Sequence, residues 1–174
     1  CGRGLVPEHR HLLHLGERRI DCSCETCWSL QSGNPDYRPV GTRVAWLPDL
    51  QMSDEQWAGF SIPIGLAFFM KSSTADGVVA LYPSPAGATE SELEMGTWES
   101  LADSNPVLGE METDAEGLVV NRLSDPPQYA IAPIDQCYML VGLVKANWEG
   151  ISGGTGLEAA IAGYFDDLHA RASV

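Results

Sequence analysis

The sequence predicts an α+β fold in which a small cysteine-rich module precedes an antiparallel sheet packed with about three helices. Two observations support this class. Three cysteines lie within the segment CSCETC at residues 22–27, and a further thiol stands at Cys1. The rest of the chain shows two hairpin patterns and three helical patterns without regular strand–helix–strand alternation, which favours an antiparallel sheet.

The first element is a short hairpin. Residues 11–15 and 18–22 form two short strand patterns around a glycine-containing turn. A hairpin with cysteines at both ends is the layout of a zinc ribbon. Thiolates at CxxC spacing converge on a soft, tetrahedral metal ion, whereas a CxC pair is too close to form an unstrained disulfide. We therefore interpret Cys1, Cys22, Cys24 and Cys27 as metal ligands.

Several alternatives for this site stay open. An upstream cysteine could complete the first knuckle with Cys1, which would leave Cys22 as a bystander, and His9 or His11 could replace a thiolate. The bound ion is zinc in the favoured interpretation and rubredoxin-like iron in the other. A CxxC redox pair and unligated surface cysteines are the remaining explanations.

The metal module is expected to end within a linker. Trp28 and Leu30 follow the second knuckle and could cover the metal on its apolar side. Residues 31–39 are rich in turn-forming residues. We therefore divide the chain into a zinc-ribbon-like module, residues 1–38, and an α+β domain, residues 39–174.

The domain opens with a short helix and a hairpin. Ser53 and Gln56 form a capping box that predicts a helix over residues 54–60. Residues 66–70 and 78–82 are apolar and valine-rich, and an Asp-Gly pair between them predicts a hairpin.

A loop and a second helix are expected next. Two prolines predict an ordered loop over residues 82–87, because proline does not donate to a strand ladder. Thr89 and Glu92 read as a second capping box, which opens a helix that continues to about Asp103. The same segment could receive an anion at the helix N-terminus, although capping alone explains it.

The last third predicts a second hairpin and two helices. Residues 118–123 and 129–132 form the hairpin, and Asp135 is expected to N-cap a helix that stops at Gly150. A strand over part of that helix stays open, because valine and glycine weaken its helical propensity. Residues 157–169 form the final helix. One apolar stripe of the first of these helices carries Cys137, Val141, Val144 and Trp148, and we interpret Cys137 as a small core residue.

Length and composition bound the class of protein. The chain has 174 residues, 44% of them hydrophobic, which suffices for one core and a small appendage. Its five cysteines are too few for a secreted disulfide scaffold, and no apolar run approaches the roughly 20 residues that cross a bilayer. We expect a cytoplasmic protein without membrane insertion. Because the chain starts at Cys1, we expect further residues upstream; a processed lipoprotein is the alternative.

Charge narrows the choice of partner. The net charge is −14, and the sequence has no basic residue between Lys71 and Arg122, where acidic residues accumulate. Such a surface repels phosphate, so we expect no nucleic-acid partner. The acidic segment is either a solvated face or a docking face for a basic partner.

Several segments together resemble a known family. The matching segments are residues 9–13 (HRHLL), 22–27 (CSCETC), 82–91 (YPSPAGATES), 105–108 (NPVL), 120–122 (VNR), 133–138 (PIDQCY), 140–143 (LVGL) and 148–154 (WEGISGG). Through these segments the sequence is similar to an uncharacterised actinobacterial family whose genes often lie beside nickel–iron hydrogenase structural and maturation genes. Members of that family begin with a CxxC pair, of which only Cys1 is present here.

The resemblance implies a setting and no activity. With no catalytic motif in the sequence, we expect a non-catalytic accessory or subunit protein of a nickel–iron hydrogenase system. Its partners would be hydrogenase subunits or maturation proteins, and self-association into a homo-oligomer is left open. The alternative is an electron-transfer or metal-delivery protein with a rubredoxin-like iron site at the cysteine cluster.

Overall fold

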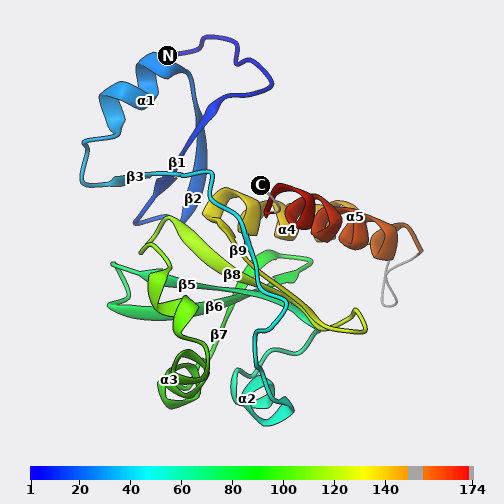
Figure 1. Ribbon diagram of the computed structural model, residues 1–174. Coiled ribbons are helices and arrows are strands. Elements are labelled where there is room, and N and C mark those ends of the chain that lie inside the picture. Colours follow the sequence, from blue (N-terminus) through cyan, green and yellow to red (C-terminus); the bar gives the residue numbers. More distant parts are fainter. Residues whose placement is uncertain (149–154, 173–174) are drawn as a thin grey trace.

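The computed structural model describes residues 1–148 and 155–172, which form two antiparallel sheets and five α-helices (Figure 1). The smaller sheet has the strand order β2-β1-β3 and lies at one end of the molecule. Its strands are β1 (Arg10–His14), β2 (Arg19–Ser23) and β3 (Tyr37–Pro39). The predicted N-terminal hairpin is confirmed, since Leu13 lies opposite Ile20 in an antiparallel ladder.

The larger sheet has six strands in the order β4-β9-β8-β5-β6-β7, and every neighbouring pair is antiparallel. Both hairpins predicted for the domain are present, as β5 with β6 and β8 with β9. The strands are β4 (Ala45–Trp46), β5 (Leu66–Ser72), β6 (Gly77–Ser84), β7 (Gly87–Ser91), β8 (Glu116–Asn121) and β9 (Gln128–Pro133). The α+β class is therefore confirmed.

Helices cover both faces of the six-stranded sheet. In Figure 1, α4 and α5 lie on the face nearer the N-terminal module, and α2 and α3 lie on the opposite face. Helix α1 follows β2 in the module. The helices are α1 (Glu25–Gln31), α2 (Asp54–Gly59), α3 (Met95–Ser104), α4 (Ile134–Ala146) and α5 (Thr155–Ala172), with a 3-10 helix η1 (Pro106–Glu110) after α3.

Strand β5 shows how the sheet builds two cores. Phe68 packs against Tyr138 of α4, with ring centroids 5.3 Å apart, whereas Phe69 stacks on Trp98 of α3 at 5.6 Å. Successive side chains of a strand point to opposite faces, so a strand covered on both sides must be apolar at every position. Residues 66–70 are accordingly all buried, which explains their unbroken apolar run.

The loop expected at residues 82–87 is wrong, because β6 continues through Pro83 and turns into β7. Pro83 lies opposite Ala88, and Ser84 lies opposite Gly87, whose φ of +119° suits glycine. The ladder between β6 and β5 ends at Leu81, so Pro83 needs no hydrogen bond on that side.

The capping box expected at Thr89 and Glu92 is also wrong. Thr89 lies in β7, where its hydroxyl donates to Ser84 Oγ at 2.8 Å. Helix α3 begins only at Met95, and Glu94 precedes it without a side-chain cap bond. Pairing with β6 over the whole length of β7 therefore outweighs the local capping signal. The expected end of this helix near Asp103 is confirmed, because α3 ends at Ser104.

Two other helix predictions are confirmed in full. Helix α2 carries the expected capping box, with Ser53 Oγ accepting from the Gln56 amide at 3.1 Å. Helix α5 extends over the predicted residues 157–169. One apolar face of this helix is buried, through Leu157, Ile161, Phe165 and Leu168.

Helix α4 begins two residues earlier than expected. Pro133 occupies the N-cap position, and Asp135 lies in the first turn, where its Oδ1 accepts the Gln136 amide at 2.8 Å. Because the Gln136 amide uses only Oδ1, the second carboxylate oxygen of Asp135 is available for another partner. The helix runs through Ala146, so the strand alternative is wrong, and its stripe of Cys137, Val141 and Val144 is buried. The expected stop at Gly150 lies outside the described residues.

The N-terminal hairpin packs directly on the domain. Leu13 is 1% exposed and belongs to the core that α4 and α5 form with the large sheet. Arg18, in the hairpin turn, pairs with Glu90 of β7, and Arg43 Nε lies 3.3 Å from Glu116 Oε1. Strand β3 ends at Pro39, next to the expected boundary. The division of the chain at residue 38 stays a prediction.

Candidate metal centre

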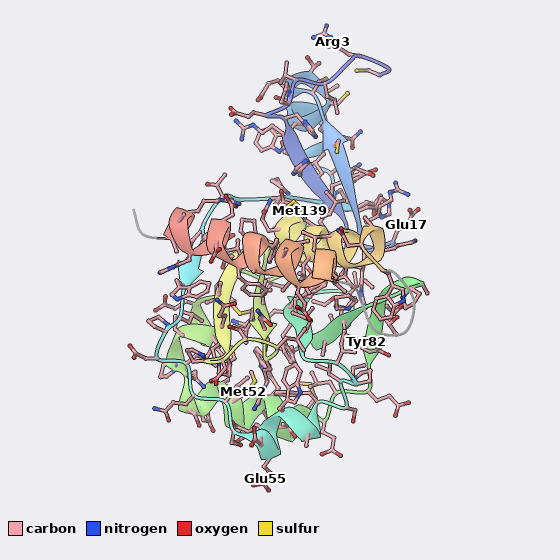
Figure 2. All side chains as sticks on the ribbon, turned by 90° about the vertical axis from the view of Figure 1, so that its right-hand side faces the viewer. Arg3, Glu17, Met52, Glu55, Tyr82 and Met139 are labelled. Atoms are coloured by element: carbon pink, nitrogen blue, oxygen red, sulfur yellow. The ribbon has the colours of Figure 1, made fainter. Side chains whose placement is uncertain are left out.

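The cysteine cluster lies at the outer end of the module, where β2 passes into α1. Figure 2 shows Arg3 at this end of the molecule and Glu55 at the opposite end. Cys24 has extended backbone angles and occupies the N-cap position of α1, and Cys27 lies in the first turn. The sequence reasoning did not predict this helix, although the CxxC segment spans its start. The helical turn is what brings the two thiols to the same side.

Three thiol groups converge at this point. Cys1 Sγ lies 3.7 Å from Cys24 Sγ, and the Sγ atoms of Cys1, Cys24 and Cys27 all lie within 4.8 Å of one another. Zinc–sulfur bonds of about 2.3 Å in a tetrahedron separate two sulfurs by about 3.8 Å. The spacing of the first pair therefore suits ligands that share one ion. The N-terminal amine lies 4.0 Å from Cys27 Sγ.

The local electrostatics favour a thiolate at Cys24. The Cys27 backbone N–H and then the Cys27 thiol lower the pKa of Cys24, because both hydrogen-bond to its sulfur. The thiolate is the form that binds metal. All five cysteines are free thiols, and Cys24 and Cys27 are half-buried while Cys1 is exposed.

The neighbours of the cluster differ from expectation in part. Trp28 is half-buried and carries the Arg10 guanidinium over its ring, 4.4 Å from the ring centroid. Arg10 Nε also donates to Glu25 at 3.1 Å. Leu30 is 74% exposed and does not cover the cluster.

Cys22 lies apart from the other three thiols. It stands directly opposite His11 in the β1–β2 ladder, and its sulfur groups with nitrogens of His9 and His11. Strand β2 ends at Ser23, and so Cys24 leaves the sheet while Cys22 keeps the strand geometry. Cys22 and Cys24 are only two positions apart in the sequence, but they therefore belong to two different groups of side chains.

The three histidines of the hairpin divide as their spacing predicts. His9 and His11 lie on one face, with ring centroids 4.8 Å apart and rings nearly perpendicular. His14 lies on the other face and packs edge-on against Tyr37 at 5.0 Å. In the sequence, His9 and His11 stand out only as replacements for a thiolate, and it was not predicted that the two group together.

Two other candidates are explained by the fold. Cys137 is fully buried and burial raises its pKa above the ordinary value, which suits the expected core residue. Its sulfur packs against Gly117, where an added Cβ would lie 2.9 Å away. Residues 84–89 belong to the β6–β7 hairpin rather than to a helix N-terminus, so the anion-binding interpretation of this loop loses its basis.

Fold and site together define an α+β protein with a cysteine-rich hairpin module, in which three thiols are placed to hold a metal ion. The chain belongs to DUF5947, a family of unknown function, which matches residues 1–172. No curated protein and no solved structure matches the chain. Among the residues that the structure describes, no helix is both long enough and apolar enough to cross a membrane.

Proposed function

We propose that this protein is a non-catalytic accessory or subunit protein of a nickel–iron hydrogenase system. Cys1, Cys24 and Cys27 hold a structural zinc ion, and the α+β domain binds hydrogenase subunits or maturation proteins. The observation that carries the proposal is the convergence of three thiol groups on a module whose helix α1 buries no residue. A module with so little core of its own gains most from a bound ion.

The hydrogenase setting has a separate support. It rests on the resemblance of the sequence to a family encoded beside hydrogenase genes, above all over the proline-rich residues 82–91. Exposed acids of the segment between Lys71 and Arg122, such as Glu92, Glu94 and Glu99, could pair with basic side chains of a partner.

Metal analysis tests the site. Protein purified with and without oxygen should be colourless and contain zinc, and the Cys24→Ser variant should contain one zinc ion fewer per chain. A red, iron-containing protein would support the alternative, an electron-transfer or metal-delivery protein, because sulfur-only ligand sets also suit iron. Wild-type zinc content in Cys24→Ser would contradict both.

A genetic experiment tests the setting. Deletion of the gene should lower the amount of mature hydrogenase, and the wild-type gene should restore it while Cys24→Ser should not. A pull-down from native extract with the full chain should recover a hydrogenase subunit or maturation protein. Normal levels of mature enzyme in the deletion strain would contradict the proposed partner without affecting the metal site.

A further inference from the structure

A second group of metal-binding side chains lies on the hairpin. His9 directly precedes β1, His11 lies in β1, and Cys22 lies opposite His11 on β2. One nitrogen of each histidine and the cysteine sulfur lie within 4.8 Å of one another. This group has no residue in common with the thiol cluster of Cys1, Cys24 and Cys27.

Hydrogen bonds fix which nitrogen of each ring is free. His9 Nδ1 lies 2.8 Å from the Val6 carbonyl oxygen, and His11 Nδ1 lies 2.6 Å from Asp135 Oδ2. A carbonyl and a carboxylate accept, so both Nδ1 atoms carry the hydrogen. In neutral rings each Nε2 then presents a lone pair.

These two lone pairs point at each other. The Nε2 atoms of His9 and His11 lie 3.1 Å apart. Two acceptors at that distance repel unless a proton or a cation lies between them. Nitrogens bound to one tetrahedral zinc ion at about 2.0–2.1 Å would be about 3.3–3.4 Å apart, which is close to the observed separation.

Asp135 completes the arrangement from another part of the chain. It lies in the first turn of α4, and its side chain is 13% exposed. Histidines that bind metals commonly donate the other ring nitrogen to a carboxylate, which orients the ring and makes the binding nitrogen more basic. His11 is held in this way by a residue 124 positions away in sequence.

We propose that His9 Nε2, His11 Nε2 and Cys22 Sγ form a second site for a zinc-class divalent cation, with Asp135 as its positioning residue. Two nitrogens and one sulfur are typical of zinc and cobalt rather than of magnesium or calcium. Three protein ligands leave a fourth position of the tetrahedron for water or a partner's ligand. The site does not depend on the proposed function, because none of its ligands belongs to the thiol cluster.

Cobalt titration of the metal-free full chain, followed by visible absorption and equilibrium dialysis, tests the proposal. Wild type should bind two cobalt ions per chain. His9→Gln and Cys22→Ser should each remove one ion and leave the absorption of the thiol cluster intact, whereas Cys24→Ser should remove the other. His14→Gln is the matched control, since His14 lies on the same strand and faces away; it should keep both ions.

The positioning role of Asp135 has its own test. Asp135→Asn should weaken cobalt binding at the second site by about 10–100-fold, and Asp135→Glu should restore part of the affinity. Addition of zinc to ¹⁵N-labelled protein should shift the Nε2 resonances of His9 and His11 and leave those of His14 in place. If Asp135 had only a structural role, its substitution would not selectively alter the ring resonances of His9 and His11.

Two results would overturn the second site. One is full cobalt stoichiometry in both His9→Gln and Cys22→Ser. The other is loss of all bound cobalt in either variant, which would mean a single shared site. Circular dichroism checks folding, and His9→Gln remains informative if Cys22→Ser does not fold, because His9 precedes the strand. Loss of cobalt in Cys24→Ser alone concerns the proposed function and leaves this site standing.

Discussion

The N-terminal module and the six-stranded domain reach stability by different routes. The domain sandwiches its sheet between two helical layers, and both faces of β5 are buried. The module has a three-stranded sheet, a seven-residue helix without buried residues, and only Leu12, Leu13 and Ser23 below the surface. We infer that the domain is held by hydrophobic burial, while the module depends on bound metal and on its contact with α4.

The largest expected effect tests the domain. Phe69→Ala should lower the free energy of unfolding by about 3–5 kcal/mol, because the ring is fully buried between Phe60 and Trp98. Urea unfolding followed by circular dichroism measures it. The control Leu30→Ala, on the exposed face of α1, should stay within about 0.5 kcal/mol of wild type. A loss below about 1 kcal/mol at Phe69 would mean that the core relaxes around the change.

A comparable change tests the junction between the regions. Leu13→Ala should cost about 2–5 kcal/mol, because this module side chain fills the core of the domain. If module and domain unfold together, the single urea transition should shift as a whole. The matched control Leu5→Ala changes a side chain that is 41% exposed. A shift confined to a separate, earlier transition would show two independent units and support the division near residue 38.

Removal of the metal should lower the local stability of the module much more than that of the domain. Chelation of the metal-loaded protein should speed amide hydrogen exchange in α1 by roughly tenfold or more, since about 1.4 kcal/mol of lost local stability is a factor of ten. Exchange in β5 and β8 should change little. Cys24→Ser without chelator should reproduce the effect. Equal loss of protection in the sheet would show that the domain also needs the ion.

The smallest expected effect concerns the thiol cluster itself. The pKa of Cys24 is lowered, so its thiolate persists to lower pH than in an unfolded peptide. In metal-free protein, the rate of iodoacetamide modification of Cys24 should therefore rise at lower pH than in urea-denatured protein. Cys27→Ala removes one of the two hydrogen bonds to Cys24. The pH midpoint of the modification rate should therefore move part of the way toward that of the denatured protein. Identical midpoints in folded and denatured protein would contradict this account.

The elements that the sequence predicted correctly are those with strong local signals. The Asp-Gly turn between β5 and β6 and the capping box of α2 need only their neighbours to form. Strand β7 was missed for the opposite reason. Thr89 and Glu92 resemble a cap, and only pairing with β6 reveals the strand.

The candidate site was predictable in part. Residues 22–27 pointed to a metal, but sequence spacing could not show that Cys24 leaves the strand for a helix while Cys22 stays in it. The register offered a usable signal, because the expected turn at Gly16-Glu17 already places His11 opposite Cys22. The contribution of Asp135 required the tertiary structure, since it comes from a distant helix.

Strand β7 is an outer strand of the large sheet, and Glu90 on it pairs with Arg18 from the hairpin turn. An open strand border invites pairing with another polypeptide and hence aggregation. The Arg18–Glu90 pair and the hairpin turn that carries Arg18 lie at this edge and disfavour pairing with another chain. A shortened version of the protein without its first forty residues would lose Arg18 and this pair, and we expect it to associate through β7 more readily.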